Sequence, residues 1–142
     1  MTVPLHFWVD PLMQALSSEA KLLALYLTTG PHTTRLGCFR CLKGDLVDDL
    51  QVSLESLDQS LEALRRIAFI RYDASNDWLW VMPFLEWHPI ENPHQARAIE
   101  SGWDQLPPEM LFLSPLAEKL KCQPHLHPCF LERLERLSQE AR

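Results

Sequence analysis

The sequence is poor in glycine, has no long apolar run and carries no excess of positive charge. Only four of its 142 residues are glycine, and none forms the glycine-rich loop that cradles phosphate groups in nucleotide-binding enzymes. No apolar stretch approaches the roughly 18 residues of a membrane span. With 13 basic and 19 acidic side chains, the formal net charge is −6. This balance excludes binding of nucleic acid through bulk positive charge, although it leaves room for a local basic surface.

Targeting and catalytic signatures are also missing. The first ten residues hold no basic segment followed by an apolar core, so we expect no secretory signal. The four cysteines are then expected to be reduced thiols in the cytoplasm. Neither G-x-S-x-G, H-E-x-x-H nor a P-loop occurs. We therefore expect a cytoplasmic protein that is not an enzyme and uses no cofactor.

What is present is an ordinary globular composition, 46% hydrophobic and 23% charged. Residues 19–29 are apolar nearly all round and predict a buried helix capped by Ser17 or Ser18. A second helix, capped by Ser53, is marked by a stripe of leucines at helical spacing: Leu54, Leu57, Leu61 and Leu64. The other expected elements are a short strand or turn leading into a short helix at 7–16, strands at 36–42, 67–72 and 78–82, a helix at 43–50 and a turn at 73–77.

This order of elements predicts an α+β, mainly α fold of the winged-helix class. Such a fold joins a helix-turn-helix to a β-hairpin wing and a small antiparallel sheet. We assign residues 1–88 to the winged-helix domain. Frequent prolines divide residues 89–142 into short helical pieces, which we expect at 92–103, within 108–121 and from Pro128 onward. This helical extension is expected to pack on the winged helix or on a second subunit.

Four segments in the first hundred residues follow one another as in a known family: LSSEAKLLALYLTTGPHT (16–33), GCFR (37–40), WVMPFLEWH (80–88) and NPHQARAIE (92–100). Together they resemble the winged-helix domain of phage and prophage replication-initiation proteins, the replisome-organiser or DnaD-like N-terminal domain. The resemblance implies a cytoplasmic, non-enzymatic module. Such a module helps to assemble a replication complex by contacting DNA, another copy of itself or a helicase loader.

If the protein binds duplex DNA, the helix at 53–66 is the expected recognition helix. Its side opposite the leucine stripe would enter the major groove, while neighbouring basic side chains would contact phosphates. The candidate DNA-binding residues are the basic and polar side chains of this helix, of the adjacent segments and of the wing: Arg35, Arg40, Lys43, Ser56, Gln59, Arg65, Arg66 and Arg71.

The outward side of this helix is nevertheless acidic. Glu55 and Glu62 lie there with one base, Arg66, and a carboxylate near the bases is repelled by phosphate unless it accepts a hydrogen bond from a cytosine amino group. No basic stripe emerges elsewhere. A second interpretation therefore stays open, in which the chain is a protein–protein interaction or dimerisation module without direct DNA binding. A small transcriptional regulator is a third interpretation.

Cysteine and histidine residues could in principle hold zinc. The candidate ligands are a C-x-x-C pair and a cluster near the C-terminus: Cys38, Cys41, Cys122, His125, His127 and Cys129. We do not favour a metal site, because residues three apart on a strand point to opposite faces and no glycine or proline makes a knuckle between the first pair. The alternative is that Cys38 and Cys41 are small core residues.

The C-terminal region also predicts self-association. The last helix is amphipathic, with an apolar side formed by Phe130, Leu131, Leu134 and Leu137. A second group of apolar residues lies in the wing and directly after it: Trp78, Trp80, Phe84, Leu85 and Trp87. Two-fold pairing of these tails would cover such a surface, so we expect a homo-oligomer. The alternative is a tail that folds back on its own winged helix.

Overall fold

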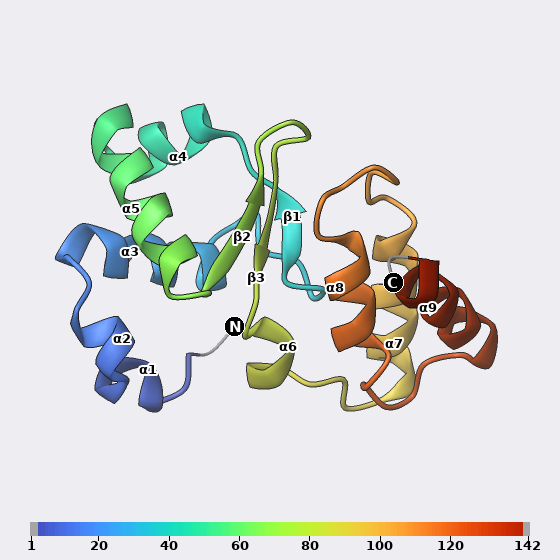
Figure 1. Cartoon of the computed structure of the whole chain (residues 1–142). Helices are drawn as coiled ribbons and strands as arrows, with labels where there is room; N and C mark the ends of the chain where they lie inside the picture. The colour runs from blue at the N-terminus through green and yellow to red at the C-terminus, as the bar shows by residue number, and fades with distance from the viewer. Residues whose placement is uncertain (1–2, 141–142) are drawn as a thin grey trace. The chain divides into compact units, whose positions relative to one another are not determined.

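The computed structural model describes residues 3–140 and is α+β, with 55% helix and one three-stranded antiparallel sheet. The chain forms two compact units, Met1–Trp87 and His88–Arg142. Within the described residues the first unit contains α1 (His6–Val9), α2 (Pro11–Gln14), α3 (Ser18–Thr29), β1 (Cys38–Arg40), α4 (Lys43–Leu50), α5 (Leu54–Arg66), β2 (Ile70–Asp73), β3 (Trp78–Val81) and α6 (Phe84–Trp87). The second contains α7 (Pro93–Trp103), α8 (Leu113–Leu120) and α9 (Pro128–Glu140) (Figure 1).

The sheet of the first unit has the strand order β1-β3-β2, and both pairs are antiparallel. Tyr72 lies opposite Leu79, and Phe39 lies opposite the same leucine on the other side. This confirms the predicted β-hairpin. Its turn is held by the buried Asp73 carboxylate, which accepts hydrogen bonds from the backbone N–H groups of Ser75 and Asn76. An Asp at this place stabilises a turn because its side chain replaces a backbone acceptor.

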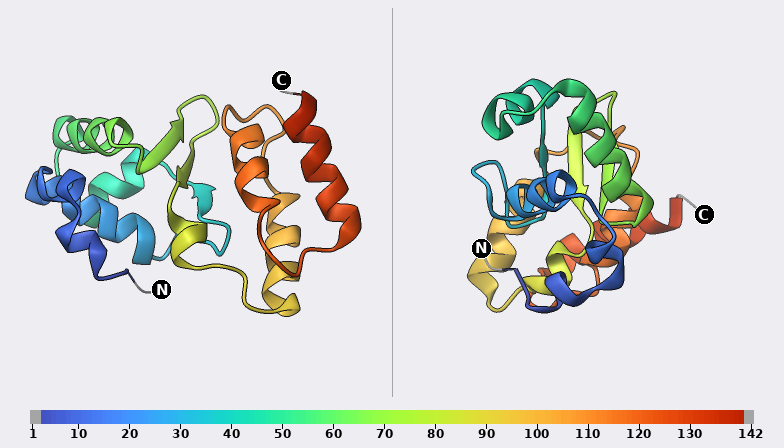
Figure 2. Two further views of the ribbon diagram at one scale, coloured as in Figure 1. Left: turned by 60° about the horizontal axis from the view of Figure 1, so that its bottom comes forward. Right: turned by 90° about the vertical axis from the view of Figure 1, so that its left-hand side faces the viewer.

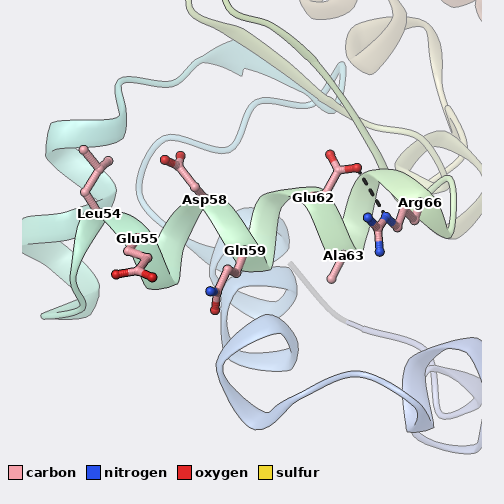
Figure 3. Close-up of a pocket in the computed structure, with 7 residues that line it drawn as sticks. All are labelled: Leu54, Glu55, Asp58, Gln59, Glu62, Ala63 and Arg66. Atoms are coloured by element: carbon pink, nitrogen blue, oxygen red, sulfur yellow. Dashed lines mark hydrogen bonds and ion pairs between the residues drawn. The ribbon is translucent and has the colours of Figure 1, made fainter.

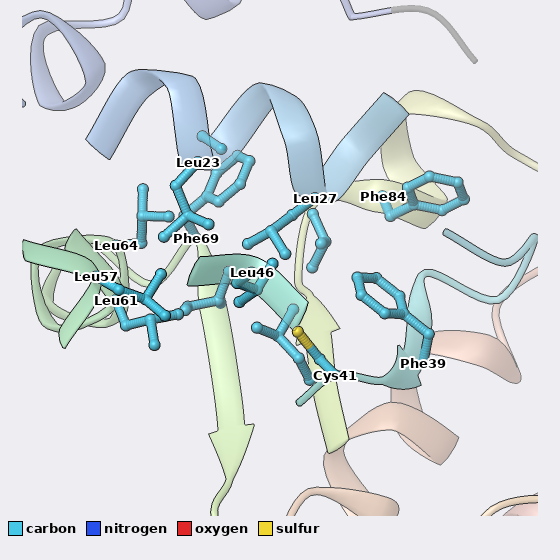
Figure 4. Close-up of a cluster of buried hydrophobic side chains, with 14 of the residues drawn as sticks. Leu23, Leu27, Phe39, Cys41, Leu46, Leu57, Leu61, Leu64, Phe69 and Phe84 are labelled. Atoms are coloured by element: carbon cyan, nitrogen blue, oxygen red, sulfur yellow. The ribbon is translucent and has the colours of Figure 1, made fainter. Parts of the chain in front are cut away.

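The core of the first unit lies between α3, α4, α5 and one face of the sheet. Leu23 and Leu27 of α3 are buried against the leucines of α5, and Leu46 enters from α4 (Figure 4). The predicted caps of both long helices are confirmed: Ser17 Oγ accepts from the Ala20 N–H, and Ser53 Oγ accepts from the Ser56 N–H.

The structure departs from the sequence expectations at three places in this unit. Leu54 is 54% exposed, so it is not part of the buried leucine stripe formed by Leu57, Leu61 and Leu64. Leu22 of the supposedly buried helix α3 is also exposed. The short helix expected within 7–16 forms as α2, but no strand precedes it: the helix α1 takes that place, and the inward side chains of the two helices are Phe7 and Met13.

The second unit is a helical assembly in which α8 and α9 lie side by side (Figure 2). Asn92 caps α7 by accepting from the Gln95 N–H. Phe130 and Leu134 of α9 are buried, and the Phe130 ring packs edge-on against Trp103 at 6.0 Å between centroids. The apolar face of α9, on which pairing of two tails was predicted, is therefore occupied within its own unit.

A charged clamp joins α7 to the loop before α9. The Glu100 carboxylate accepts from the His127 N–H at 2.8 Å and from the Arg97 guanidinium at 3.0 Å. Arg97 also donates to the His125 carbonyl at 2.6 Å.

Among residues 3–140, no helix combines the length and apolar character that a membrane span requires.

Candidate functional site

Helix α5 carries the candidate site on the side that faces away from the core. Leu57, Leu61 and Leu64 are buried on its inner side, which turns the opposite side to solvent. There an open hollow is lined by seven residues of α5 alone: Leu54, Glu55, Asp58, Gln59, Glu62, Ala63 and Arg66 (Figure 3). Because one helix supplies all of them, this is a surface and not an enclosed cavity. We call these seven residues the α5 face.

Glu62 pairs with both arginines at the end of α5 and offsets one of their two positive charges. The Arg65 guanidinium donates to both carboxylate oxygens of Glu62, at 2.8 and 2.6 Å. Arg66 Nε donates to one of the same oxygens at 3.3 Å (Figure 3). The hydrogen bond from Arg65 is the largest cause that lowers the pKa of the Glu62 carboxyl to about 2. Both arginine side chains remain exposed, so either can leave Glu62 at little cost.

Two more of the predicted DNA-binding residues are held by carboxylates. Lys43 Nζ lies 2.8 Å from the Asp58 carboxylate and 5.9 Å from the centre of the Tyr72 ring. The Ser56 hydroxyl donates to the Glu19 carboxylate of α3. Lys43 and Ser56 therefore connect α4 and α3 to α5 instead of standing free for phosphate.

The other predicted residues lie apart from this group. Gln59 is exposed on the α5 face and makes no side-chain hydrogen bond within residues 3–140. Arg35 precedes the sheet, while Arg40 on β1 and Arg71 on β2 lie opposite Trp78 and Trp80 of the central strand. Since Phe39, Ile70 and Leu79 face the core, strand alternation places Arg40 and Arg71 on the other face of the sheet. The eight candidates do not form one basic surface.

The charge of the α5 face is negative. It contains three carboxylates and one guanidinium, and the first unit as a whole has eleven acidic and seven basic side chains. Glu55 lies in the first turn of α5, where the helix dipole would otherwise favour an anion. The carboxylate of Glu55 would repel a phosphate at that helix end.

The candidate zinc ligands are not assembled into a metal site in the part of the chain that the structure describes, since it contains no group of three or more His, Cys, Asp or Glu residues able to hold an ion. Cys38 and Cys41 are buried free thiols, as the core alternative predicted. Burial raises the pKa of both thiols, and that of Cys41 reaches about 12 with help from Asp45 and Asp77.

The C-terminal candidates have other roles. Cys122 and Cys129 are exposed. His127 Nδ1 accepts a hydrogen bond from the Cys129 N–H at 3.1 Å, which begins α9. His125 has a left-handed backbone with φ of 70° and offers its carbonyl to Arg97. These residues shape a helix start and a turn.

Some contacts of the site region could not be read from the sequence. The Tyr26 hydroxyl donates to the Asp49 carboxylate, joining α3 to α4, and burial followed by this hydrogen bond raises the pKa of Tyr26 to about 12. The Ser56–Glu19 contact joins residues 37 apart. By contrast, Glu62 stands three and four residues before Arg65 and Arg66, a spacing that does predict helical ion pairs.

Comparison with known proteins identifies no relative: no family model matches the chain, and no curated protein or solved structure is significantly similar to it.

Proposed function

We propose that the first unit is a winged-helix binding module that docks a positively charged, partly apolar segment of another protein on the α5 face. The observation that carries the proposal is the composition of that face, three carboxylates with one guanidinium beside the exposed side chain of Leu54. The order α3, β1, α4, α5, β2, β3 supports the winged-helix assignment. The resemblance to replication-initiation proteins suggests that the docked segment belongs to a replication assembly.

Charge complementarity explains why such a partner fits. Lysine or arginine side chains of the partner would contact Glu55 and Asp58, while an apolar side chain would cover Leu54. Opposite charges across an interface accelerate encounter and set the register of binding, and their effect weakens with salt. Docking of a basic segment would also displace Lys43 from Asp58, at the small cost of an exposed ion pair.

The test uses two labelled peptides with the same apolar residues, one with lysines and the other with glutamates at its charged positions. In ¹⁵N NMR titrations of the full chain, the basic peptide should shift the amides of α5, and the acidic peptide should not. The double variant Glu55→Gln/Asp58→Asn should raise the Kd for the basic peptide at least about tenfold, which corresponds to a loss of roughly 1.4 kcal/mol of binding free energy.

The matched control is Glu132→Gln/Glu135→Gln, which removes the same number of exposed carboxylates from α9 of the second unit. It should bind the basic peptide as the unaltered chain does. Equal weakening in both double variants would show attraction by net charge alone and would overturn docking on the α5 face.

Binding of duplex DNA is the second candidate function. It is favoured by Arg40 and Arg71, whose side chains make no hydrogen bond or ion pair within residues 3–140, and by the 74% exposure of the Arg66 side chain. Arg66→Ala should then weaken binding and reduce its salt dependence by about one counterion. Fluorescence anisotropy with a labelled duplex at low salt tests this candidate, and absence of binding at tens of micromolar, roughly the limit of non-specific affinity, would refute it.

A further inference from the structure

An apolar patch on α1 and α2 has no role in the proposed docking. Of the eight large apolar side chains that are exposed among the described residues, four lie between positions 5 and 12. Their exposed fractions are 89% for Leu5, 54% for Trp8, 67% for Val9 and 54% for Leu12. We call these four residues the α1–α2 patch. Single exposed apolar residues are common on proteins, whereas a group of this kind marks an interaction surface.

The patch is carried by a firmly anchored segment. Phe7 is buried, and its ring packs edge-on against Phe69 and Trp87 at 6.4 and 6.2 Å between centroids. Met13 is buried from α2. Because these anchors hold the two short helices from the inside, the outward side chains keep their exposure.

Local hydrogen bonds also fix the two helices relative to each other. The Asp10 carboxylate accepts from the Leu12 N–H at 2.8 Å and caps α2. The Gln14 side-chain amide of α2 donates back to the Trp8 carbonyl of α1 at 3.3 Å. The patch therefore belongs to one ordered corner of the first unit, and no large rearrangement is needed before it can bind.

We infer that the α1–α2 patch is the surface through which two copies of this chain pair. The first argument is area. Taken with the sizes of leucine, valine and tryptophan side chains, these exposed fractions correspond to roughly 500 Å² of apolar surface per copy. Two-fold pairing would bury about 1,000 Å², the lower bound of a specific interface. Trp8 is half-exposed, and tryptophan is one of the residues that dominate the energy of such contacts.

The second argument is charge. Between residues 3 and 16 the only acidic side chain is Asp10, whose carboxylate is already used as a cap, and the only other titratable one is His6. The segment that carries the patch therefore brings no pair of like charges of its own to the contact between two copies. The rest of the first unit is acidic, with ten further carboxylates and seven basic groups, so two copies repel each other at longer range. Added salt should screen this repulsion and strengthen pairing, whereas it weakens docking of a basic segment.

A third argument concerns the alternative surface. The apolar face of α9 that the sequence offered for pairing is buried against its own unit through Phe130 and Leu134. Pairing through that face would require the second unit to open. Pairing through the α1–α2 patch does not require either unit to open, because the patch is already exposed.

Sedimentation equilibrium of the full chain at two salt concentrations tests the inference. The protein concentration runs from about 5 to 200 µM, because a small interface is expected to give a weak Kd within this range. The unaltered chain should form dimers at the upper concentrations, with a smaller Kd at the higher salt. Trp8→Asp and, independently, Val9→Asp should each raise the Kd at least about tenfold. Both side chains are exposed, and unchanged circular dichroism spectra will show that the variants are folded.

Leu111→Asp is the matched control, because Leu111 is similarly exposed, at 73%, but lies in the second unit. It should leave the Kd within about twofold of the unaltered value. A chain that stays monomeric at the highest concentration in both salts would overturn the inference. So would dimers that persist unchanged in Trp8→Asp and Val9→Asp, since their interface would then lie elsewhere.

Discussion

Glu62 accepts hydrogen bonds from two guanidinium groups, and this makes it the residue that decides the charge at the end of α5. Its carboxyl has a pKa of about 2, below the ordinary value of 4.5. The stabilisation that it gives is therefore complete above pH 4.5 and is lost as the pH falls through about 2. At neutral pH the ionised Glu62 carboxylate therefore offsets part of the positive charge of Arg65 and Arg66.

We expect Arg65→Ala to raise the pKa of Glu62 towards its ordinary range, because the hydrogen bond from Arg65 is the main cause of the low value. A ¹³C NMR titration of the side-chain carboxyl measures this pKa directly. Arg71→Ala, which removes an arginine that does not contact Glu62, should leave the midpoint unchanged. An unchanged midpoint in Arg65→Ala would show that the ion pair does not persist in solution.

The four cysteines should differ sharply in reactivity. Cys38 and Cys41 are buried with raised thiol pKa values, so they hold little thiolate and admit no reagent, whereas Cys122 and Cys129 are exposed. Iodoacetamide at about pH 8 should alkylate only the exposed pair in the folded protein, and all four after unfolding. Mass spectrometry of the peptides identifies the sites, and labelling of Cys41 in the folded state would contradict its place in the core.

At the scale of elements, α6 closely approaches the start of β1 at Gly37, a position where a side chain would not fit. Gly37 has φ of 77°, and a Cβ there would lie 2.6 Å from Cβ of Phe84, which begins α6. The Gly37 carbonyl also accepts a hydrogen bond from the Val81 N–H at the end of β3. The close approach of α6 to the start of β1 therefore depends on this position.

We expect Gly37→Ala to destabilise the first unit by about 2 to 4 kcal/mol, for two reasons. The backbone at this position is left-handed, and the new methyl group would collide with Cβ of Phe84, which cannot move without the backbone of α6. Gly44→Ala is the control with the opposite sign. Nothing lies within 4 Å of its Cβ position, and alanine in helix α4 should add about 0.5 to 1 kcal/mol. Urea unfolding measures both, and equal effects would contradict the packing of α6.

At the scale of the whole molecule, net charge and local charge make different predictions about DNA. The chain carries a net charge of −6, so any affinity for duplex must come from a local surface that overcomes this repulsion.

If α5 enters the groove, Glu55→Lys should strengthen duplex binding at low salt by about tenfold or more, because it replaces a repelled carboxylate with a phosphate ligand. Glu132→Lys changes the net charge of the chain equally but lies on α9. It should have a much smaller effect. Anisotropy titrations with one labelled duplex compare the two, and an equal gain would show that only total charge matters.

Local sequence signals determined much of the fold. The polar turn between two apolar segments specified the β2–β3 hairpin, and Ser17 and Ser53 specified where α3 and α5 begin, because capping and turn chemistry act over three or four residues. The leucines of α5 were predicted to face the core, and Leu57, Leu61 and Leu64 do. Leu54 does not, since periodicity gives the direction of a side chain but not the extent of the surface that will cover it.

Only the tertiary structure decided which charged and apolar groups remain available. Lys43 meets Asp58 across 15 residues and Ser56 meets Glu19 across 37, contacts that depend on how α3, α4 and α5 pack together. The amphipathic pattern of α9 was clear in the sequence, but the same pattern suits a neighbouring helix or a second copy, and packing against α8 resolved it. Leu5, Trp8, Val9 and Leu12 have the same helical spacing, which does not by itself tell whether their side faces the core or solvent. Their exposure follows from Phe7 and Met13 taking the inward positions, because a short segment anchored by two side chains must turn the others towards solvent.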